Sequence, residues 1–161
     1  MDIRRDFYLE KLIKRKSNGL IKVITGIRRC GKSYLLNNIF YHHLLDSGVE
    51  ADHIIRFAFA SADDLYLIGE RLIQIEKEKR GVDPEKFMAY IRSKTTGEGI
   101  YYLLLDEIQM LDCFEAVLNG YLRKENIDVF VTGSNAKLLS KDITTEFAGR
   151  GDEIHMYPLS F

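Results

Sequence analysis

The chain has 161 residues, of which 46% are hydrophobic and 29% are charged, and its formal net charge is −1. This length and composition fit one compact α/β domain with a sizeable core, and we treat residues 1–161 as a single domain. The near-neutral charge argues against a protein covered in nucleic-acid-binding surface. No stretch approaches the ~18 apolar residues of a membrane span, and Cys30 and Cys113 have neither disulfide nor zinc-site spacing. These features favour a cytoplasmic protein without a membrane partner.

Residues 1–18 form an N-terminal segment with the pattern of an amphipathic helix. Within residues 1–16, six basic and three acidic side chains are interleaved with apolar ones. This pattern predicts a helix that packs one face on the domain and exposes a basic face to solvent.

A glycine-rich motif follows at residues 26–33, which read Gly-Ile-Arg-Arg-Cys-Gly-Lys-Ser. They match the phosphate-binding pattern G-x-x-x-x-G-K-[ST], which arises by chance in a chain of this length on the order of 1% of the time or less. The apolar run 20–25 predicts a buried strand before the motif, and the spacing of apolar residues over 34–45 predicts a helix after it. A strand, a glycine loop and a helix therefore follow in the order that a nucleoside triphosphate site requires.

The positions of this motif have separate roles in binding a triphosphate. Gly26 and Gly31 allow backbone N–H groups to approach phosphate oxygens closely. Lys32 would reach the β- and γ-phosphates, and the Ser33 hydroxyl would bind Mg²⁺. The predicted nucleotide-binding residues are Gly26, Ile27, Arg28, Arg29, Cys30, Gly31, Lys32, Ser33 and Tyr34.

Three residues in the middle of the loop have a simpler interpretation. Arg28 and Arg29 could assist triphosphate binding, but side chains at such positions usually point into solvent, which we favour here. Cys30 lies beside a predicted helix N-terminus, where a thiol is prone to oxidation. A tolerated small side chain is favoured over a regulatory role for it.

Apolar runs alternate with helical patterns along the rest of the chain. Residues 54–60 predict a second strand, and 65–79 predict a helix. Asp83 and Pro84 are typical of an N-cap and a first helical position, and they open a helix that reaches about residue 94. This alternation predicts a mostly parallel sheet covered on both faces.

The third predicted strand, 101–105, ends in two adjacent carboxylates. Ligands bind beyond the carboxyl ends of strands in open α/β sheets, so the pattern matches a Walker B element. Asp106 would hold Mg²⁺, and Glu107 would polarise the attacking water of a hydrolase. An ordinary acidic strand end is the alternative, and the phosphate loop upstream favours the catalytic interpretation.

A capping box at Asp112 and Glu115 predicts the start of a further helix, and 127–132 predicts the fourth strand. In a sheet of order 5-1-4-3-2, the fourth strand lies between the first and the third. Asn135, or less favourably Ser134, would then lie beside the two carboxylates as a sensor of the γ-phosphate. Gly, Ser and Asn are also usual turn formers, so a plain turn is the competing interpretation.

Arg150 precedes a last predicted strand at 153–157. An arginine here could stabilise charge in the transition state, either within its own subunit or in a neighbour. A solvent-facing turn arginine is almost equally favoured.

The motifs together resemble a known family, the AAA-like ATPases of bacteria and archaea that carry an uncharacterised C-terminal domain. The resemblance covers the chain from about residue 20 to its end and rests on the segments 26–33, 105–109, 132–136 with 138–140, 149–150 and 158–161. It implies an additional-strand P-loop ATPase fold, a three-layer sandwich with a five-stranded sheet of order 5-1-4-3-2. Lys32, Ser33, Asp106, Glu107 and Asn135 fall on the nucleotide and sensor positions of the family, and Arg150 on an arginine of less secure role. Members of the family continue beyond the Pro-Leu-Ser-Phe segment at 158–161. The resemblance therefore also implies that this chain is one domain of a longer protein, truncated before further C-terminal domains.

The predicted function is therefore Mg²⁺-dependent ATP binding and hydrolysis that drives a conformational change in a larger protein. Two alternatives remain open: an ATP-sensing or interaction module with little turnover, and a small-molecule P-loop kinase. A GTPase is disfavoured because the guanine-reading N-K-x-D pattern does not occur. The sequence leaves open a homo-oligomer, and a nucleic-acid or protein client that would be reached through further C-terminal domains.

Overall fold

The computed structural model describes residues 3–26, 31–133 and 150–157. Its centre is a five-stranded sheet in which the strand pairings are parallel. The strands are β1 (Ile21–Thr25), β2 (Ile54–Ala58), β3 (Tyr101–Asp106), β4 (Ile127–Thr132) and β5 (Gly151–His155). They lie side by side in the order β2-β3-β4-β1-β5. This confirms the predicted strand order and the parallel α/β fold class.

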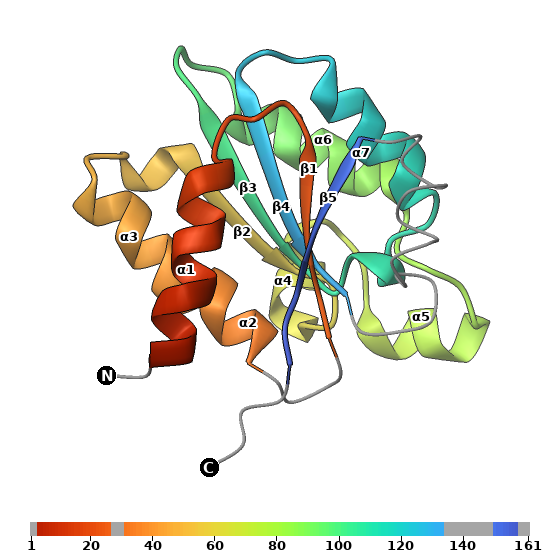
Figure 1. Ribbon diagram of the computed structural model, residues 1–161. Helices are drawn as coiled ribbons and strands as arrows, with labels where there is room; N and C mark the ends of the chain where they lie inside the picture. Colours follow the sequence, from red (N-terminus) through yellow and green to blue (C-terminus); the bar gives the residue numbers. More distant parts are fainter. Residues whose placement is uncertain (1–2, 27–30, 134–149, 158–161) are drawn as a thin grey trace.

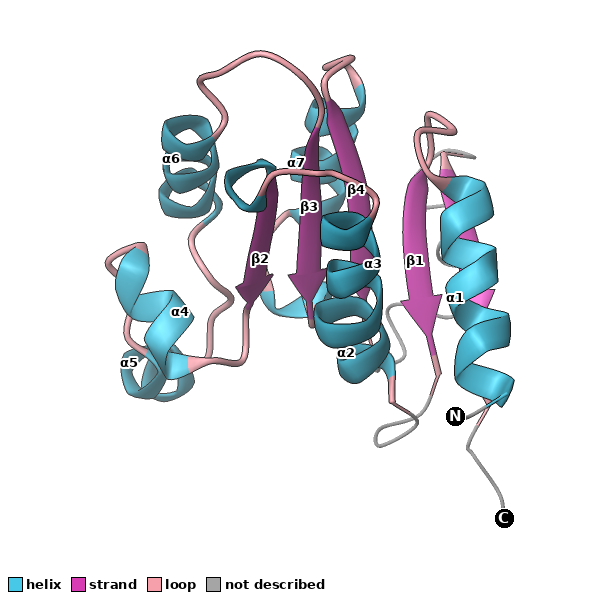
Figure 2. Ribbon diagram, turned by 90° about the vertical axis from the view of Figure 1, so that its left-hand side faces the viewer, coloured by secondary structure: helices cyan, strands magenta, loops and turns pink. Residues whose placement is uncertain are grey.

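Helices on both faces complete the predicted three-layer sandwich (Figure 1). One face carries α1 (Ile3–Arg15) and a continuous helical stretch after the phosphate-loop motif (Figure 2). That stretch consists of α2 (Lys32–Tyr34), the π-helical turn η1 (Leu35–Phe40) and α3 (Tyr41–Asp46). Both helical predictions for this face, the N-terminal segment and the helix over 34–45, are confirmed.

The opposite face carries α6 (Pro84–Lys94) and α7 (Phe114–Leu122). Two short helices, α4 (Ala62–Leu67) and α5 (Leu72–Glu78), lie in the connection from β2 to α6. None of the described helices combines the length and apolar character needed to cross a membrane.

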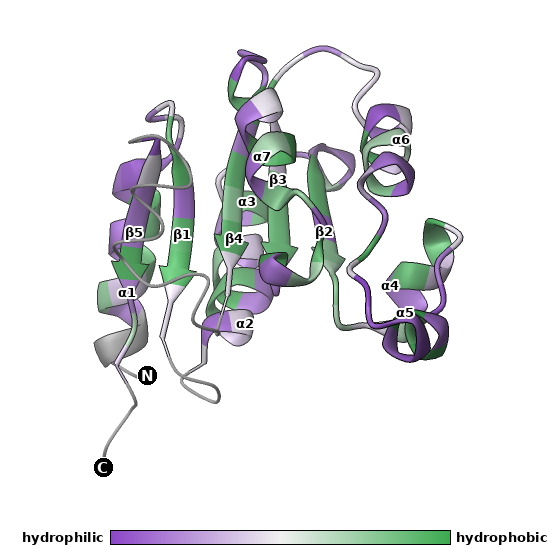
Figure 3. Ribbon diagram, turned by 90° about the vertical axis from the view of Figure 1, so that its right-hand side faces the viewer, coloured by the Kyte–Doolittle hydropathy of each residue, from purple (hydrophilic) through white to green (hydrophobic). Residues whose placement is uncertain are grey.

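The strand residues alternate between two hydrophobic cores, one under each helical layer. Val23, Leu103 and Leu105 contribute to the larger core, which includes residues of α6 and α7. Ile24 and Leu104 contribute to the smaller core, which includes residues of α1 and of the helical stretch after the phosphate loop. Because both faces are covered, the central strand β3 is apolar up to its last residue, Asp106, and its hydrophobic part is coloured green in Figure 3.

The single helix predicted over 65–79 is wrong, because the structure divides this stretch into α4 and α5. Gly69, with φ +81°, lies in the break between them. The next side chain, Glu70, is 2% exposed and accepts hydrogen bonds from Arg80 at 2.7 and 3.1 Å and from Lys86 at 3.3 Å. These contacts hold Glu70 inside a turn, so they outweigh the helical pattern of the local sequence.

The starts of α7 and β5 also differ from the prediction. The capping box is wrong: the N-cap of α7 is Cys113, at φ +55° and without a side-chain cap. The preceding Asp112 donates its N–H to the carbonyl of Val82 at 3.0 Å, which holds this segment in a bridge. The last strand was expected at 153–157, but it begins at Gly151 because it pairs with β1 over the whole length of β1.

The amino ends of β1 and β4 share a buried ion pair. Lys22 is fully buried, and its Nζ lies 2.5 Å from Oδ1 of Asp128, which is 6% exposed. Burial lowers the pKa of Lys22, and the charge of Asp128 opposes this shift. Oδ2 of Asp128 accepts the backbone N–H of Ser17 at 2.8 Å, so the pair also fastens the connection between α1 and β1.

Candidate functional site

The phosphate-loop motif lies between the carboxyl end of β1 and the start of α2. Gly26, at φ +146°, follows β1 directly, and Gly31, at φ +92°, is the N-cap of α2. Both are backbone conformations that glycine adopts without strain. Lys32 is 5% exposed, and its Nζ donates to the carbonyl of Gly26 at 2.8 Å. The lysine ammonium group therefore lies against the first residue of the loop.

The two predicted metal ligands are in direct contact. The Ser33 hydroxyl lies 2.8 and 2.9 Å from Oδ1 and Oδ2 of Asp106. Ser33 belongs to α2, whereas Asp106 is the last residue of β3, so this contact joins the two sequence motifs. A carboxylate and a hydroxyl are hard oxygen donors of the kind that Mg²⁺ prefers. Their chemistry and proximity fit a magnesium ion held by Ser33 and Asp106.

A third residue, which the sequence analysis did not assign to the site, connects the two acidic residues. Thr132, the last residue of β4, is fully buried. Its hydroxyl donates to Oδ1 of Asp106 at 2.5 Å and accepts the backbone N–H of Glu107 at 3.0 Å. The signal that could have revealed it is a hydroxyl at the end of an apolar strand that the sheet order places next to Asp106.

Glu107 leaves the strand direction at a sharp turn. Its backbone has φ +58°, a left-handed conformation that is uncommon outside glycine. It precedes the short 3₁₀ turn η3 (Ile108–Met110). From that turn, the side-chain amide of Gln109 donates to the Glu107 carboxylate in a short hydrogen bond. The side chain of Glu107 is therefore held close to its own turn.

Arg150 lies at the other end of the sheet. Its carbonyl accepts the backbone N–H of Ile21, the first residue of β1, at 2.8 Å. The phosphate loop follows the last residue of β1, so the length of this strand, ~16 Å at ~3.3 Å per residue, separates the two positions. Among the candidate residues that the structure describes, Arg150 therefore lies apart from Lys32 and Ser33 of its own chain, which follow the carboxyl end of β1.

The remaining predicted residues are placed as follows. Tyr34 is in α2 and is 47% exposed. Ile27, Arg28, Arg29, Cys30 and Asn135 lie outside the described residues, as does Ser134.

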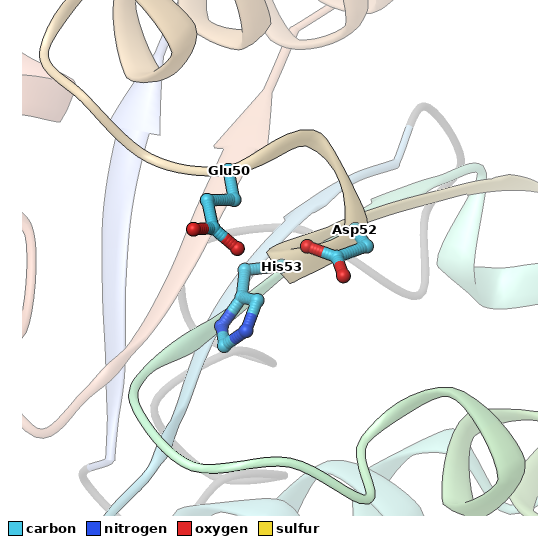
Figure 4. Close-up of side chains that lie close together, drawn as sticks. All are labelled: Glu50, Asp52 and His53. Atoms are coloured by element: carbon cyan, nitrogen blue, oxygen red, sulfur yellow. The ribbon is translucent and has the colours of Figure 1, made fainter.

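A second group of potential metal ligands lies at the turn η2 (Ala51–His53), which leads into the amino end of β2 (Figure 4). Glu50, Asp52 and His53 each offer one ligand atom, and these atoms lie within 4.8 Å of one another. Both carboxylates are exposed. The imidazole is held by the fold, because its Nδ1 lies 3.1 Å from the carbonyl of Ile100 and its ring stacks on Tyr101 at 4.1 Å. This group is at the opposite end of the sheet from the phosphate loop.

A groove of about 900 Å³ lies between α4 and α5. Its lining includes exposed apolar side chains, Tyr66 and Ile73, together with Arg71 and Glu78. Ser33 and Thr132, whose hydroxyls contact Asp106, are not among the described residues that line it.

The fold and the site together define a class of protein. A parallel sheet of order β2-β3-β4-β1-β5, with a glycine loop after β1 and paired carboxylates at the end of β3, is a P-loop nucleotide-binding domain. A family model described as AAA domain matches residues 18–161, and the chain belongs to this family. Membership supports nucleotide binding and an ATPase-like role.

The relatives of this chain are longer proteins. It is 35% identical over 161 residues to an uncharacterized protein of Haemophilus influenzae, with 99% of this chain and 36% of the relative covered. It is 34% identical over 159 residues to the uncharacterized protein MJ1544 of Methanocaldococcus jannaschii, with 99% and 30% covered. The chain thus spans about a third of the length of these relatives.

Solved structures share the fold at low sequence identity. A chain of the Drosophila ORC structure bound to AT-rich DNA and Cdc6 has a TM-score of 0.57 and 14% identity, covering 98% of this chain and 56% of that one. AMPPCP-bound DnaA from Aquifex aeolicus has a TM-score of 0.54 and 16% identity, covering 92% and 44%.

Proposed function

We propose that this domain binds ATP with Mg²⁺ and hydrolyses its β–γ phosphoanhydride bond. The observation that carries the proposal is the contact between Ser33 and Asp106 at 2.8 and 2.9 Å. It brings together two motifs 73 residues apart in the sequence, at the sheet edge where ligands of open α/β sheets bind. The structure of the same fold that contains AMPPCP indicates a suitable probe.

Each residue of the site would have a separate role in binding or hydrolysing ATP. Lys32 would leave the Gly26 carbonyl to pair with the β- and γ-phosphates. Ser33 and Asp106 would hold Mg²⁺, which supplies charge neutralisation for the phosphates. Glu107 would orient and deprotonate the attacking water through a carboxylate that also accepts the hydrogen bond from Gln109, because the two oxygens together offer about four acceptor sites. Asn135 would contact the γ-phosphate from the segment after β4.

The first test measures binding of a fluorescent ATP analogue and Mg²⁺-dependent phosphate release by the chain and three variants. Lys32→Ala should weaken nucleotide binding ~10-fold or more, because it removes charge-assisted hydrogen bonds. Glu107→Gln should keep binding and lower turnover by ~10²–10⁴-fold, the usual contribution of a general base. Lys14→Ala, which changes an exposed lysine of α1, is the matched control and should alter neither.

The outcomes separate the proposal from its main alternative. Binding without phosphate release in the unmodified chain would instead indicate an ATP-sensing module. No nucleotide binding by the unmodified chain would contradict the proposal as a whole.

Arg150 would serve the site of a neighbouring copy, since the length of β1 separates it from the phosphate loop of its own chain. Arg150→Ala should then lower turnover by up to ~10³-fold without affecting nucleotide binding. Mixing Arg150→Ala with Lys32→Ala should restore part of the activity, because one variant keeps an intact nucleotide site and the other an intact arginine. Absence of restoration would contradict a role across an interface.

The biological role of ATP hydrolysis would depend on the longer protein to which this domain belongs. Because the relatives extend well beyond the region matched here, we propose that hydrolysis drives a conformational change in a longer, cytoplasmic protein. A nucleic-acid client and a protein client both fit this proposal. Adding either to the ATPase assay and measuring stimulation would distinguish them.

A further inference from the structure

Thr132 differs from the three residues before it in β4 because its buried side chain carries a hydroxyl. It follows Val129, Phe130 and Val131, and all four side chains are fully buried. β4 lies between β1 and β3 in the sheet, so the end of β4 is enclosed by the strands that carry the two sequence motifs. A buried hydroxyl needs hydrogen-bond partners, and both partners of this one belong to the candidate site.

The hydrogen bonds of Thr132 have a fixed direction. A backbone N–H can only donate, so the hydroxyl oxygen accepts from Glu107 at 3.0 Å. The single hydroxyl proton is then donated to Oδ1 of Asp106 at 2.5 Å. One side chain therefore fixes the carboxylate of one acidic residue and the backbone of the next.

These two hydrogen bonds act on the orientation of the Asp106 carboxylate and on the backbone conformation of Glu107. The Asp106 carboxylate has the orientation in which it also accepts from Ser33. Glu107 has a left-handed backbone at φ +58°, a conformation that persists only where the surroundings hold it. The bond from its N–H to a fully buried hydroxyl is such a restraint.

We propose that Thr132 is a positioning residue that orients Asp106 for Mg²⁺ and holds the backbone turn of Glu107. This inference rests on the proposed ATPase function. The hydroxyl, and not the volume of the side chain, carries the role, because valine would fill the same space and supply neither hydrogen bond.

The test compares Thr132→Val with Thr132→Ser, which keeps the hydroxyl. Binding of the fluorescent ATP analogue is measured in EDTA and over a range of Mg²⁺ concentrations, together with kcat, KM and the thermal midpoint. Thr132→Val should lower kcat by ~10²-fold, as small misplacements of catalytic groups do. It should also raise the Mg²⁺ concentration for half-maximal effect by ~10-fold or more. Metal-free nucleotide binding should stay within about twofold of the unmodified chain, and Thr132→Ser should recover most of both losses.

Two results would overturn the inference. One is a Thr132→Val variant with the unmodified kcat and Mg²⁺ dependence. The other is a variant in which metal-free binding and the thermal midpoint fall together with kcat and Thr132→Ser restores nothing, because this would show a purely structural role.

The inference and the proposed function fail in different ways. If the unmodified chain shows no turnover, the hydrolysis proposal fails, but the Mg²⁺-dependent gain in nucleotide affinity still reports the orientation of Asp106. Loss of that gain in Thr132→Val, with recovery in Thr132→Ser, would support the positioning role, whereas an unchanged gain would overturn it.

Discussion

Acidic side chains are buried at both ends of the parallel sheet, but their partners differ in charge. At the carboxyl end, Asp106 accepts hydrogen bonds from the hydroxyls of Ser33 and Thr132. At the amino end, Asp128 lies 2.5 Å from the ammonium group of Lys22. A hydroxyl donates a hydrogen bond to a carboxylate oxygen and leaves the negative charge in place. An ammonium group donates a hydrogen bond and also neutralises the charge. Asp106 therefore keeps a negative charge that suits the proposed Mg²⁺ site, whereas the charge of Asp128 is balanced within the fold.

Removing the charge of Asp106 should have the largest effect on the cation site proposed at the carboxyl end of the sheet. Asp106→Asn keeps the size of the side chain but removes the anionic ligand, so Mg²⁺-dependent phosphate release should fall by ~10²–10³-fold. The thermal midpoint should move by only a few degrees, because the neutral amide still offers an oxygen to both hydroxyls. Asp112→Asn, at an exposed carboxylate before α7, is the matched control. Unchanged Mg²⁺ dependence in Asp106→Asn would remove the distinction between the two ends of the sheet.

The opposite outcome is expected for Asp128→Asn. This change leaves the Lys22 ammonium buried without its carboxylate, which should cost ~3–5 kcal/mol in the free energy of unfolding. Urea denaturation measures this loss, and the Mg²⁺ dependence of nucleotide binding should stay the same. Adding Lys22→Met should recover part of the stability, because the buried charge is then gone. A loss below ~1 kcal/mol in the single variant would show that Lys22 does not depend on this pair.

Much of the fold could be predicted from the sequence because its strands are dominated by local signals. The strand 127–132 and the helix 84–94 have the predicted bounds, since apolar β-branched runs and an Asp-Pro helix start are contained within a few residues. The broken helix at 65–79 could not be predicted in this way. Its break depends on Glu70, whose partners Arg80 and Lys86 lie 10 and 16 residues further along the chain.

The site was predictable to the extent that its residues belong to motifs. The Ser33 and Asp106 positions follow from the two motifs, and the structure brings them into contact. The contact between Thr132 and Asp106 was missed, because threonine in an apolar run has the appearance of an ordinary strand residue. Only the pairing of β3 with β4 places its hydroxyl against Asp106. The assignment of Asn135 stays a prediction, because it lies outside the described residues.

Like Asp128, Glu70 is a buried carboxylate whose partners are cationic side chains. The hydrogen bonds from Arg80 are the main cause of a pKa lowered from 4.5 to about 2. Since the folded pKa lies below the unfolded value, this stabilisation is complete above about pH 4.5 and is lost as the pH falls through about 2. Glu70→Gln should therefore cost ~1.5–3 kcal/mol at pH 7, and the difference from the unmodified chain should shrink between those two pH values. Denaturation across this range measures it, and a pH-independent difference would show that charge is not the cause.

The smallest effect is expected at Asp152, which shares the amino end of the sheet with Asp128 but is 21% exposed. It lies 3.1 Å from Arg15 of α1 and accepts from Asn18 at 3.0 Å. Water screens this pair, so Asp152→Asn should cost only ~0.2–1 kcal/mol, and the cost should fade at high salt. Urea denaturation at low and high salt, beside Asp128→Asn, tests whether burial separates the two carboxylates. A loss at Asp152 that equals the loss at Asp128 and persists in salt would mean that the position at this end of the sheet, and not burial, decides how much an ion pair stabilises the domain.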